Sequence, residues 1–418
     1  MSFLTEQIME KEVLKSFKNL TPSSIFLSKS ENKLESLIKI GFPNRNSENW
    51  KYTKLSKLFK SNFNDPKSPS LKVYPKSKLP STSTSTIVVE NGKINTHLTC
   101  LDNIDGLEVA LFSESGIELA SKIDHTVSNY EDAFTYLNGY LLNEGINIKV
   151  KKHIKISQPL HIVNVVTKSC VAVNSRLNIE LEECAELTVL QSFISENSSS
   201  SFVNHVTEAH ISENANLHID KLQDYQNNYN IVSEYINQKS NSSFTINTFS
   251  YSGLLIRNGL NIDVNGQNCH TELNGVFTVS ENDYIDNHTL VNHLEPNCQS
   301  HENYKGIIED EGIGVFNGKV IVHKDAQKIQ AYQNNNNILL SDYSKVFAKP
   351  ELEIFADDVK CSHGSTTGQL DEEALFYLQS RGVGLGTAQK LLLEGFIAEI
   401  ADKISCEKFK EYVLGKLI

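Results

Sequence analysis

A short motif recurs along the middle of the chain at a nearly constant spacing. It begins at residues 184, 214, 241, 268, 297 and 325, and reads "CAELTV", "NANLHI", "NSSFTI", "NCHTEL", "NCQSHE" and "DAQKIQ". Each copy opens with small or turn-prone residues, and the first three continue with alternating apolar side chains. A period of about 28 residues with strand-like content is typical of stacked coils, each of which buries its apolar face against its neighbours.

Alternation of apolar and polar residues predicts that the middle of the chain, about 87–360, consists of strands. "LNIEL" places Leu177, Ile179 and Leu181 on one face, and "LNIDV" repeats the pattern from residue 260. Period-two alternation is typical of a strand with one buried side. An antiparallel sandwich with evenly spaced hairpins would show it too, but the constant period favours a β-solenoid.

Helical patterns flank this region on both sides. Near the N-terminus, apolar residues such as Ile8, Val13, Leu14 and Phe17 and then Leu34, Leu37 and Ile38 have helix-like spacing, and a Pro/Ser/Thr-rich linker follows from Pro66 to Thr86. Near the C-terminus, Asp371 and Thr387 are expected to cap two helices and Gly382 to end the first. We therefore expect a mainly β protein with three parts: an N-terminal helical region with its linker (1–86), a parallel β-helix core (87–365) and a C-terminal helical domain (366–418).

Composition excludes several classes of protein. The net charge is −12, although residues 1–80 alone carry 15 Lys and Arg against seven Asp and Glu. An acidic body argues against nucleic acid as a partner. No run approaches the roughly 18 apolar residues of a membrane span, and the N-terminus does not resemble a signal peptide. The seven cysteines are scattered and odd in number, which argues against a disulfide framework. We expect a cytoplasmic protein.

No motif predicts nucleotide binding or hydrolysis by this chain. Gly318-Lys319 resembles the end of a phosphate-binding loop, but Ile313 and Val320 stand where such a loop needs Gly and Ser or Thr. "RGVGLGT" follows a predicted helix instead of a strand, so it is not a dinucleotide fingerprint. Neither G-x-S-x-G nor H-E-x-x-H occurs. We therefore expect that the chain does not itself bind ATP.

The sequence "CSHG" places Cys361 and His363 two residues apart. On a strand, residues i and i+2 share a face, so both side chains could bind one ion or cluster. Two ligands do not complete a four-coordinate site, and the others would come from distant residues or another chain. The alternative is structural, because Gly364 favours a tight turn. The residues alone leave both interpretations open, and they also leave open whether Cys298 and His301 face solvent or core.

The segment from Asn292 to Phe396, which includes "NHLEPNCQSHENYKGIIEDEGIGVFNGKVIVHKDAQ" and "ADDVKCSHGSTTGQLDEEALFYLQSRGV", closely resembles the SufB/SufD family of iron–sulfur cluster assembly proteins. "GFPNRNSENWKYTKL" (Gly41–Leu55), with the only tryptophan, Trp50, resembles the N-terminal signature of the shorter of the two family members. The resemblance implies a right-handed parallel β-helix flanked by helical regions.

The resemblance also implies a role and partners. The chain would be a non-enzymatic subunit of the SufBCD scaffold complex, pairing with SufB through the solenoids and binding the SufC ATPase through its C-terminal region. Phe376, Tyr377 and Arg381 are the expected SufC contacts. Cys361 and His363 would be candidate ligands at the SufB interface for transient iron or an iron–sulfur cluster, with no cofactor held stably by the chain alone. ATP would be bound by SufC.

Two other functions remain as alternatives. The chain could be a SufB-like or homodimeric scaffold that holds a cluster by itself. A β-helix enzyme that degrades polysaccharides is a remote possibility, because it would need an export signal and carboxylate or basic side chains repeated along one solenoid face, and the sequence has neither.

Overall fold

The repeated motif forms the corners of a solenoid. The computed structural model describes residues 15–25, 27–44, 46–66, 68–73, 85–115, 124, 126–196 and 199–416. The first five motifs each place a residue in the left-handed region, with φ between 58° and 63°, namely Cys184, Asn214, Asn241, Asn268 and Asn297. Asparagine tolerates this conformation better than most residues, which explains why it recurs. In the sixth motif the left-handed residue is Lys328, so the corner lies three residues later than predicted.

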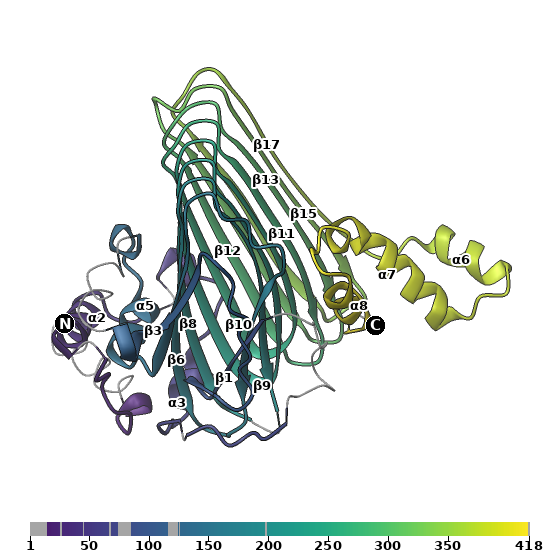
Figure 1. The fold of residues 1–418 in the computed structure, drawn as a ribbon. Coiled ribbons are helices and arrows are strands. Elements are labelled where there is room, and N and C mark those ends of the chain that lie inside the picture. The colour runs from purple at the N-terminus through teal and green to yellow at the C-terminus, as the bar shows by residue number, and fades with distance from the viewer. Residues whose placement is uncertain are drawn as a thin grey trace, which may run out of the picture.

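Two parallel sheets face each other across the solenoid (Figure 1), which has about eight turns and makes the protein mainly β. Sheet A contains β1 (Thr86–Glu90), β5 (Leu160–Val166), β7 (Glu186–Ser195), β9 (Asn216–Gln238), β10 (Ser243–Val264), β11 (His270–Val279), β13 (Gln299–Ile308), β15 (Ile329–Leu339) and β17 (Val359–Gly368). Sheet B contains β3 (Leu107–Leu111), β4 (Glu144–Val150), β6 (Ala172–Leu181), β8 (Phe202–Ile211), the second halves of β9 and β10, β12 (Tyr284–His293), β14 (Ile313–Val322) and β16 (Lys345–Ile354).

The long strands β9 and β10 run through both sheets and join them. Their register shifts between Ser250 and Ser252 and again between Gly253 and Leu255, where the ribbon passes from sheet A to sheet B. The short strand β2 (Lys93–Ile94) pairs antiparallel with β1, as β3 does with β4; the other pairings between these strands are parallel. The predicted β-solenoid is confirmed, and the antiparallel sandwich is wrong.

The apolar core lies between the two sheets. Leu177, Ile179 and Leu181, which the sequence places on one face, are all buried in it, as is the equivalent trio of Leu260, Ile262 and Val264. The side chains that point outward from each sheet meet the helical regions or solvent. One coil therefore stabilises the next by burying aliphatic surface, at roughly 25 cal/mol per Å² of apolar area.

The N-terminal helices cover the outer face of sheet B (Figure 1). They are η1 (Lys15–Phe17), α2 (Leu27–Ile40), η2 (Glu48–Trp50), α3 (Ser56–Lys60), η3 (Val127–Asn129) and α5 (Ala133–Tyr140). Phe134 of α5 packs against Trp50 and Phe202, with ring centroids 5.2 and 6.1 Å away. The helix predicted around Leu37 is confirmed, but Ile38 is exposed. The predicted apolar positions Ile8, Val13 and Leu14, and residues 67 and 74–84 of the linker, lie outside the described residues.

The C-terminal helices are α6 (Glu372–Ser380), α7 (Leu385–Ala401) and α8 (Glu407–Lys416). Side chains of α7 and α8, such as Ile397 and Phe409, pack on the outer face of sheet A, whereas α6 extends away from the solenoid and has no buried residue (Figure 1). Asp371 caps α6 as predicted, accepting hydrogen bonds from the N–H groups of Glu373 and Ala374. Thr387 does not cap α7; Gly384 occupies that position, because the helix begins three residues earlier than expected.

Candidate functional site

The last coil of the solenoid is open. β17 is the last strand of sheet A and pairs in register with β15, and β16 is the last strand of sheet B and pairs with β14. Among the described residues, these are the only strand pairings with a register for β16 and β17. Both therefore present a row of backbone N–H and C=O groups that could pair with another strand. Side chains on the inner face of this coil are not covered by a further turn.

Cys361 and His363 lie on that inner face. Cys361 is in register with Ala331 of β15, and His363 is in register with Gln333. Residues in register on neighbouring strands point to the same side, and Ala331 and Gln333 are both buried between the sheets. Cys361 is half-buried against the core and His363 is exposed. The expectation that the pair shares a face is confirmed, and the alternative of a turn at Gly364 is wrong because β17 continues to Gly368.

The surroundings of Cys361 determine the protonation of its thiol. Burial raises the pKa of the Cys361 thiol, with a backbone hydrogen bond from Ala331 opposing it, so the thiol is protonated near neutral pH. A metal ion would bind the thiolate, which means that binding at Cys361 releases a proton. No group of three or more His, Cys, Asp and Glu side chains among the described residues is arranged to hold an ion. An ion bound at Cys361 and His363 would take its other ligands from outside the described residues.

Cys298 and His301 are also close together in the sequence, but their side chains point to opposite sides of sheet A. Cys298 is fully buried beside Cys269 at a coil corner, where both thiols donate to the carbonyl oxygen of Gly266 at 3.1–3.2 Å. His301 lies half-exposed on the outer face of sheet A, with its ring centroid 5.3 Å from that of Tyr332. Cys298 therefore faces the core and His301 faces solvent. All seven cysteines are described, and all are free thiols.

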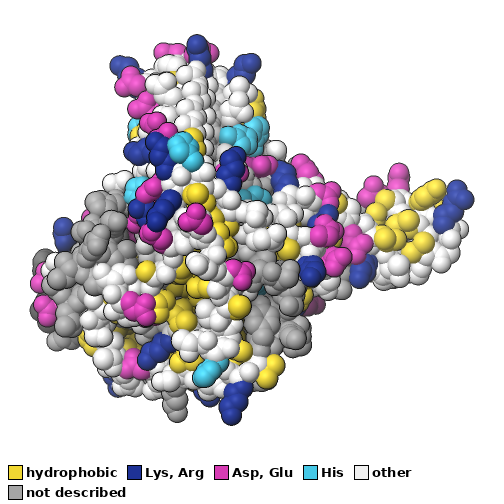
Figure 2. Space-filling view, viewed as in Figure 1, with side chains coloured by type: hydrophobic (Ala, Val, Ile, Leu, Met, Phe, Trp, Pro, Cys, Tyr) yellow, Lys and Arg dark blue, Asp and Glu magenta, His cyan; other side chains and the backbone are white. Residues whose placement is uncertain are grey.

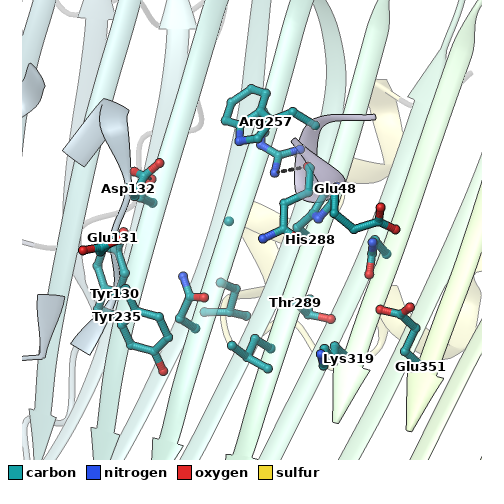
Figure 3. Close-up of a pocket in the computed structure, with 18 of the residues that line it drawn as sticks. Glu48, Tyr130, Glu131, Asp132, Tyr235, Arg257, His288, Thr289, Lys319 and Glu351 are labelled. Carbon is teal, nitrogen blue, oxygen red and sulfur yellow. Dashed lines mark hydrogen bonds between the residues drawn. The ribbon is translucent and has the colours of Figure 1, made fainter. Parts of the chain in front are cut away.

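A groove of about 630 Å³ lies between η2 and the outer face of sheet B (Figure 3). Several of its charged side chains form ion pairs. Lys349 bridges Glu48 and Glu351, each at 2.7 Å, and the buried carboxylate of Asp286 lies beside Arg257. The Lys349–Glu48 ion pair joins sheet B to the N-terminal region and so helps to fix that region in place. The sequence did not reveal it, because Glu48 and Lys349 are 301 residues apart.

The C-terminal arm carries an exposed aromatic surface. Phe376 and Tyr377 of α6 are 73% and 57% exposed, and the Arg381 guanidinium lies 5.3 Å from the centroid of the Tyr377 ring. Figure 2 shows the apolar patch on this arm with a basic side chain at its end. The three residues expected to contact SufC thus lie together on a projecting, unburied helix end. Among the described helices, none has the length and apolar character that crossing a membrane requires.

Comparisons with known proteins relate this chain to one family over most of its length. The family model of the "SUF system FeS cluster assembly, SufBD core domain" matches residues 164–396, and that of the "SufBD protein N-terminal region" matches residues 19–162. The iron-sulfur cluster assembly protein SufD of Escherichia coli (strain K12) is 30% identical over 394 residues, which cover 92% of this chain and 90% of that protein. A SufBD family protein of Synechocystis is 28% identical over 96% of this chain and 94% of its own length. The SufD protein of Bacillus subtilis is 24% identical over 68% of this chain and 66% of its own length.

Proposed function

Because the chain belongs to the SufBD family of iron–sulfur cluster assembly proteins, we propose that it is a SufD-like, non-catalytic subunit of a cytoplasmic SufBCD scaffold complex. The observation that carries this proposal is the position of Cys361 and His363 on the uncovered inner face of the last coil. A soft thiolate and an imidazole suit iron or an iron–sulfur cluster as transient cargo. In this proposal the chain supplies two ligands and an open strand edge, and a partner chain supplies the remaining ligands and the strand that pairs with this edge.

The proposed SufB interface is the open end of the solenoid. Strands β16 and β17 have free edges, and their coil exposes large apolar side chains at Phe347, Ile354 and Phe355. A partner strand added to these edges would satisfy their backbone groups and cover this apolar surface. The same pairing would bring the partner's ligands to Cys361 and His363.

The proposed SufC contact is the arm formed by α6. Aromatic and arginine side chains are the commonest anchors of protein interfaces, and Phe376, Tyr377 and Arg381 are exposed together on a helix with no buried residue. SufC would supply the ATP site. Co-purification with SufB and SufC, with the subunit ratio measured, tests this assembly.

The proposed role of the site is tested by His363→Ala in the reconstituted complex under anaerobic conditions. We expect cluster assembly to be lost while the complex stays intact, because the remaining thiol cannot hold iron without the imidazole. Ser362→Ala is the matched control, since Ser362 lies between the two residues in sequence but points to the outer face of β17. Unchanged assembly by the His363 variant would overturn the proposal. A coloured cluster in the chain purified alone would instead favour the homodimeric or SufB-like scaffold.

A further inference from the structure

Five residues stack in register across sheet A and end at His363. Ile246, Leu273, Glu302, Gln333 and His363 are paired in turn on β10, β11, β13, β15 and β17, all on the inner face. We call this set the His363 column. Its first two members are aliphatic and its last three are polar. The change from apolar to polar occurs as the column approaches the open coil.

The fold does not require Glu302 and Gln333 to be polar. Ile246 and Leu273 fill equivalent places in the same column and are completely buried. Burying a carboxyl and an amide costs free energy unless both are hydrogen-bonded. Thr289 Oγ1 donates to Glu302 Oε1 at 2.5 Å, and Gln333 Nε2 donates to Glu302 Oε2 at 2.9 Å. The carboxyl group of Glu302 therefore fixes the orientation of the Gln333 amide.

The facing sheet leaves room for this pair. Gly318 of β14 lies opposite, and a Cβ atom there would come within 2.7 Å of Phe316 Cζ, 2.9 Å of Glu302 Oε2 and 3.1 Å of Gln333 Nε2. A side chain at position 318 would push the two polar groups apart or out of line. Gly318 therefore has a packing role beside the Glu302–Gln333 pair.

One polar atom of the column is left unsatisfied. With its Nε2 committed to Glu302, the amide of Gln333 presents Oε1 as a buried acceptor that has no hydrogen-bond partner in the structure. The next residue of the column is His363, one strand away, or about 4.8 Å between strands. An imidazole ring carries an N–H donor in every protonation state it adopts here. The unsatisfied acceptor and the candidate ligand are thus neighbours in one column.

We propose that Gln333, held by Glu302, is a positioning residue for His363, and that its Oε1 accepts a hydrogen bond from one ring nitrogen when the imidazole turns inward. This bond selects one tautomer and leaves the other nitrogen free for iron. Histidines that bind metals ordinarily donate their second N–H to such an acceptor. The inference rests on the proposed role of His363 as a ligand, and it adds the part of the chain that orients it.

The test measures the tautomer of His363 in the metal-free chain by ¹⁵N NMR of the histidine rings, with His363→Asn used to assign its signals. Gln333→Leu extends the aliphatic stack of Leu273 and removes the acceptor. We expect it to shift the tautomer ratio of His363 at least threefold. Gln330→Leu is the control, because Gln330 lies on the same strand but points to the outer face. An unchanged ratio in a folded Gln333→Leu chain overturns the proposal.

Two further variants protect the test against a folding defect. Glu302→Leu removes the group that orients Gln333, and Gly318→Ala displaces the pair from the opposite sheet; each should shift the ratio in the same direction. In the reconstituted complex, titration with ferrous iron should give a 10- to 100-fold weaker affinity for Gln333→Leu than for Gln330→Leu. The NMR readout requires no metal. If the His363→Ala complex assembles clusters as wild type does, the proposed function is contradicted. If the tautomer ratio of His363 is unaltered in Gln333→Leu, the positioning role of Gln333 is contradicted.

Discussion

The guanidinium carbon of Arg257 lies 3.8 Å from the centroid of the Trp50 ring, so that a side chain of sheet B stacks on the N-terminal region. Arg257 also donates to the buried carboxylate of Asp286 and, at 2.8 Å, to the carbonyl oxygen of Asn49. Burial raises the pKa of the Asp286 carboxyl, but the charges of Arg257 and His288 outweigh that effect and hold it at about 2. Arg257 therefore links the buried charge of the solenoid to the helical region that covers it.

We expect Arg257→Ala to destabilise the protein by about 3–5 kcal/mol, because it leaves Asp286 as a buried, unpaired charge. The measurement is urea unfolding followed by the fluorescence of Trp50, which is the only tryptophan and lies at this contact. Lys349→Ala is the control, since it removes two partly exposed ion pairs in the same groove, with Glu48 and Glu351, and should have a much smaller effect. Equal losses in the free energy of unfolding for the two substitutions would show that the buried Arg257–Asp286 pair stabilises the protein no more than the exposed pairs of Lys349.

The sequence predicted the parts of this structure that depend on local geometry. Corners with a left-handed residue favour asparagine, so the recurrence of asparagine at Asn214 and Asn241 indicates the length of one coil. Two-residue alternation places Cys361 and His363 on one face of their strand, whatever surrounds it. The Arg257–Trp50 contact could not be predicted, because it joins residues 207 positions apart through tertiary packing alone.

The His363 column was hidden for a different reason. The spacing between successive motifs varies from 27 to 30 residues, and a shift of one residue moves a side chain to the opposite face of a strand. The stacking of Glu302 under Gln333 is therefore fixed only when the register of every coil is known. The late corner at Lys328 shows the same limit, since a degenerate motif placed it three residues too early.

Titration of Glu302 should make the free energy of unfolding depend on pH, and a substitution can separate this dependence from that of the other groups. Burial raises the pKa of its carboxyl from 4.5 to about 7, although the hydrogen bonds from Thr289 and Gln333 oppose that rise. The folded chain therefore keeps a proton that the unfolded chain loses. This contribution to stability is fully present below pH 4.5 and is lost as the pH rises to 7, by up to about 3 kcal/mol.

Substitution of Glu302 by Gln removes that titration while retaining a similar shape. We expect the free energy of unfolding of Glu302→Gln, relative to wild type, to increase between pH 5 and 7 and to be constant above pH 8. Urea unfolding of both proteins at one-unit pH intervals measures this difference, in which the titration of every unaltered group cancels. Parallel curves across the whole range would mean that Glu302 titrates normally in the folded protein.

Asp220 should control how firmly the C-terminal helices are attached to the solenoid. Its completely buried carboxylate, on the outer face of β9, accepts hydrogen bonds from the backbone N–H of Ser405 at 2.9 Å and from Asn247 Nδ2 at 2.7 Å. The same Asn247 amide group donates to the carbonyl oxygen of Lys403 at 3.1 Å. These bonds hold the connection between α7 and α8, and α7 leads to the arm that carries Phe376.

We expect Asp220→Ala to weaken this attachment without unfolding the solenoid, because it leaves the partly buried backbone N–H of Ser405 without its acceptor, at a cost of about 1–3 kcal/mol. Amide hydrogen exchange in α8 should then accelerate roughly tenfold to a hundredfold, while exchange in β9 and β10 is unchanged. Asp402→Ala provides the control: it removes an exposed ion pair with Lys410 that lies entirely within the helical domain. Faster exchange in the strands as well as in α8 would mean that Asp220 supports the solenoid itself, in which case the arm and the coils would not be independent units of stability.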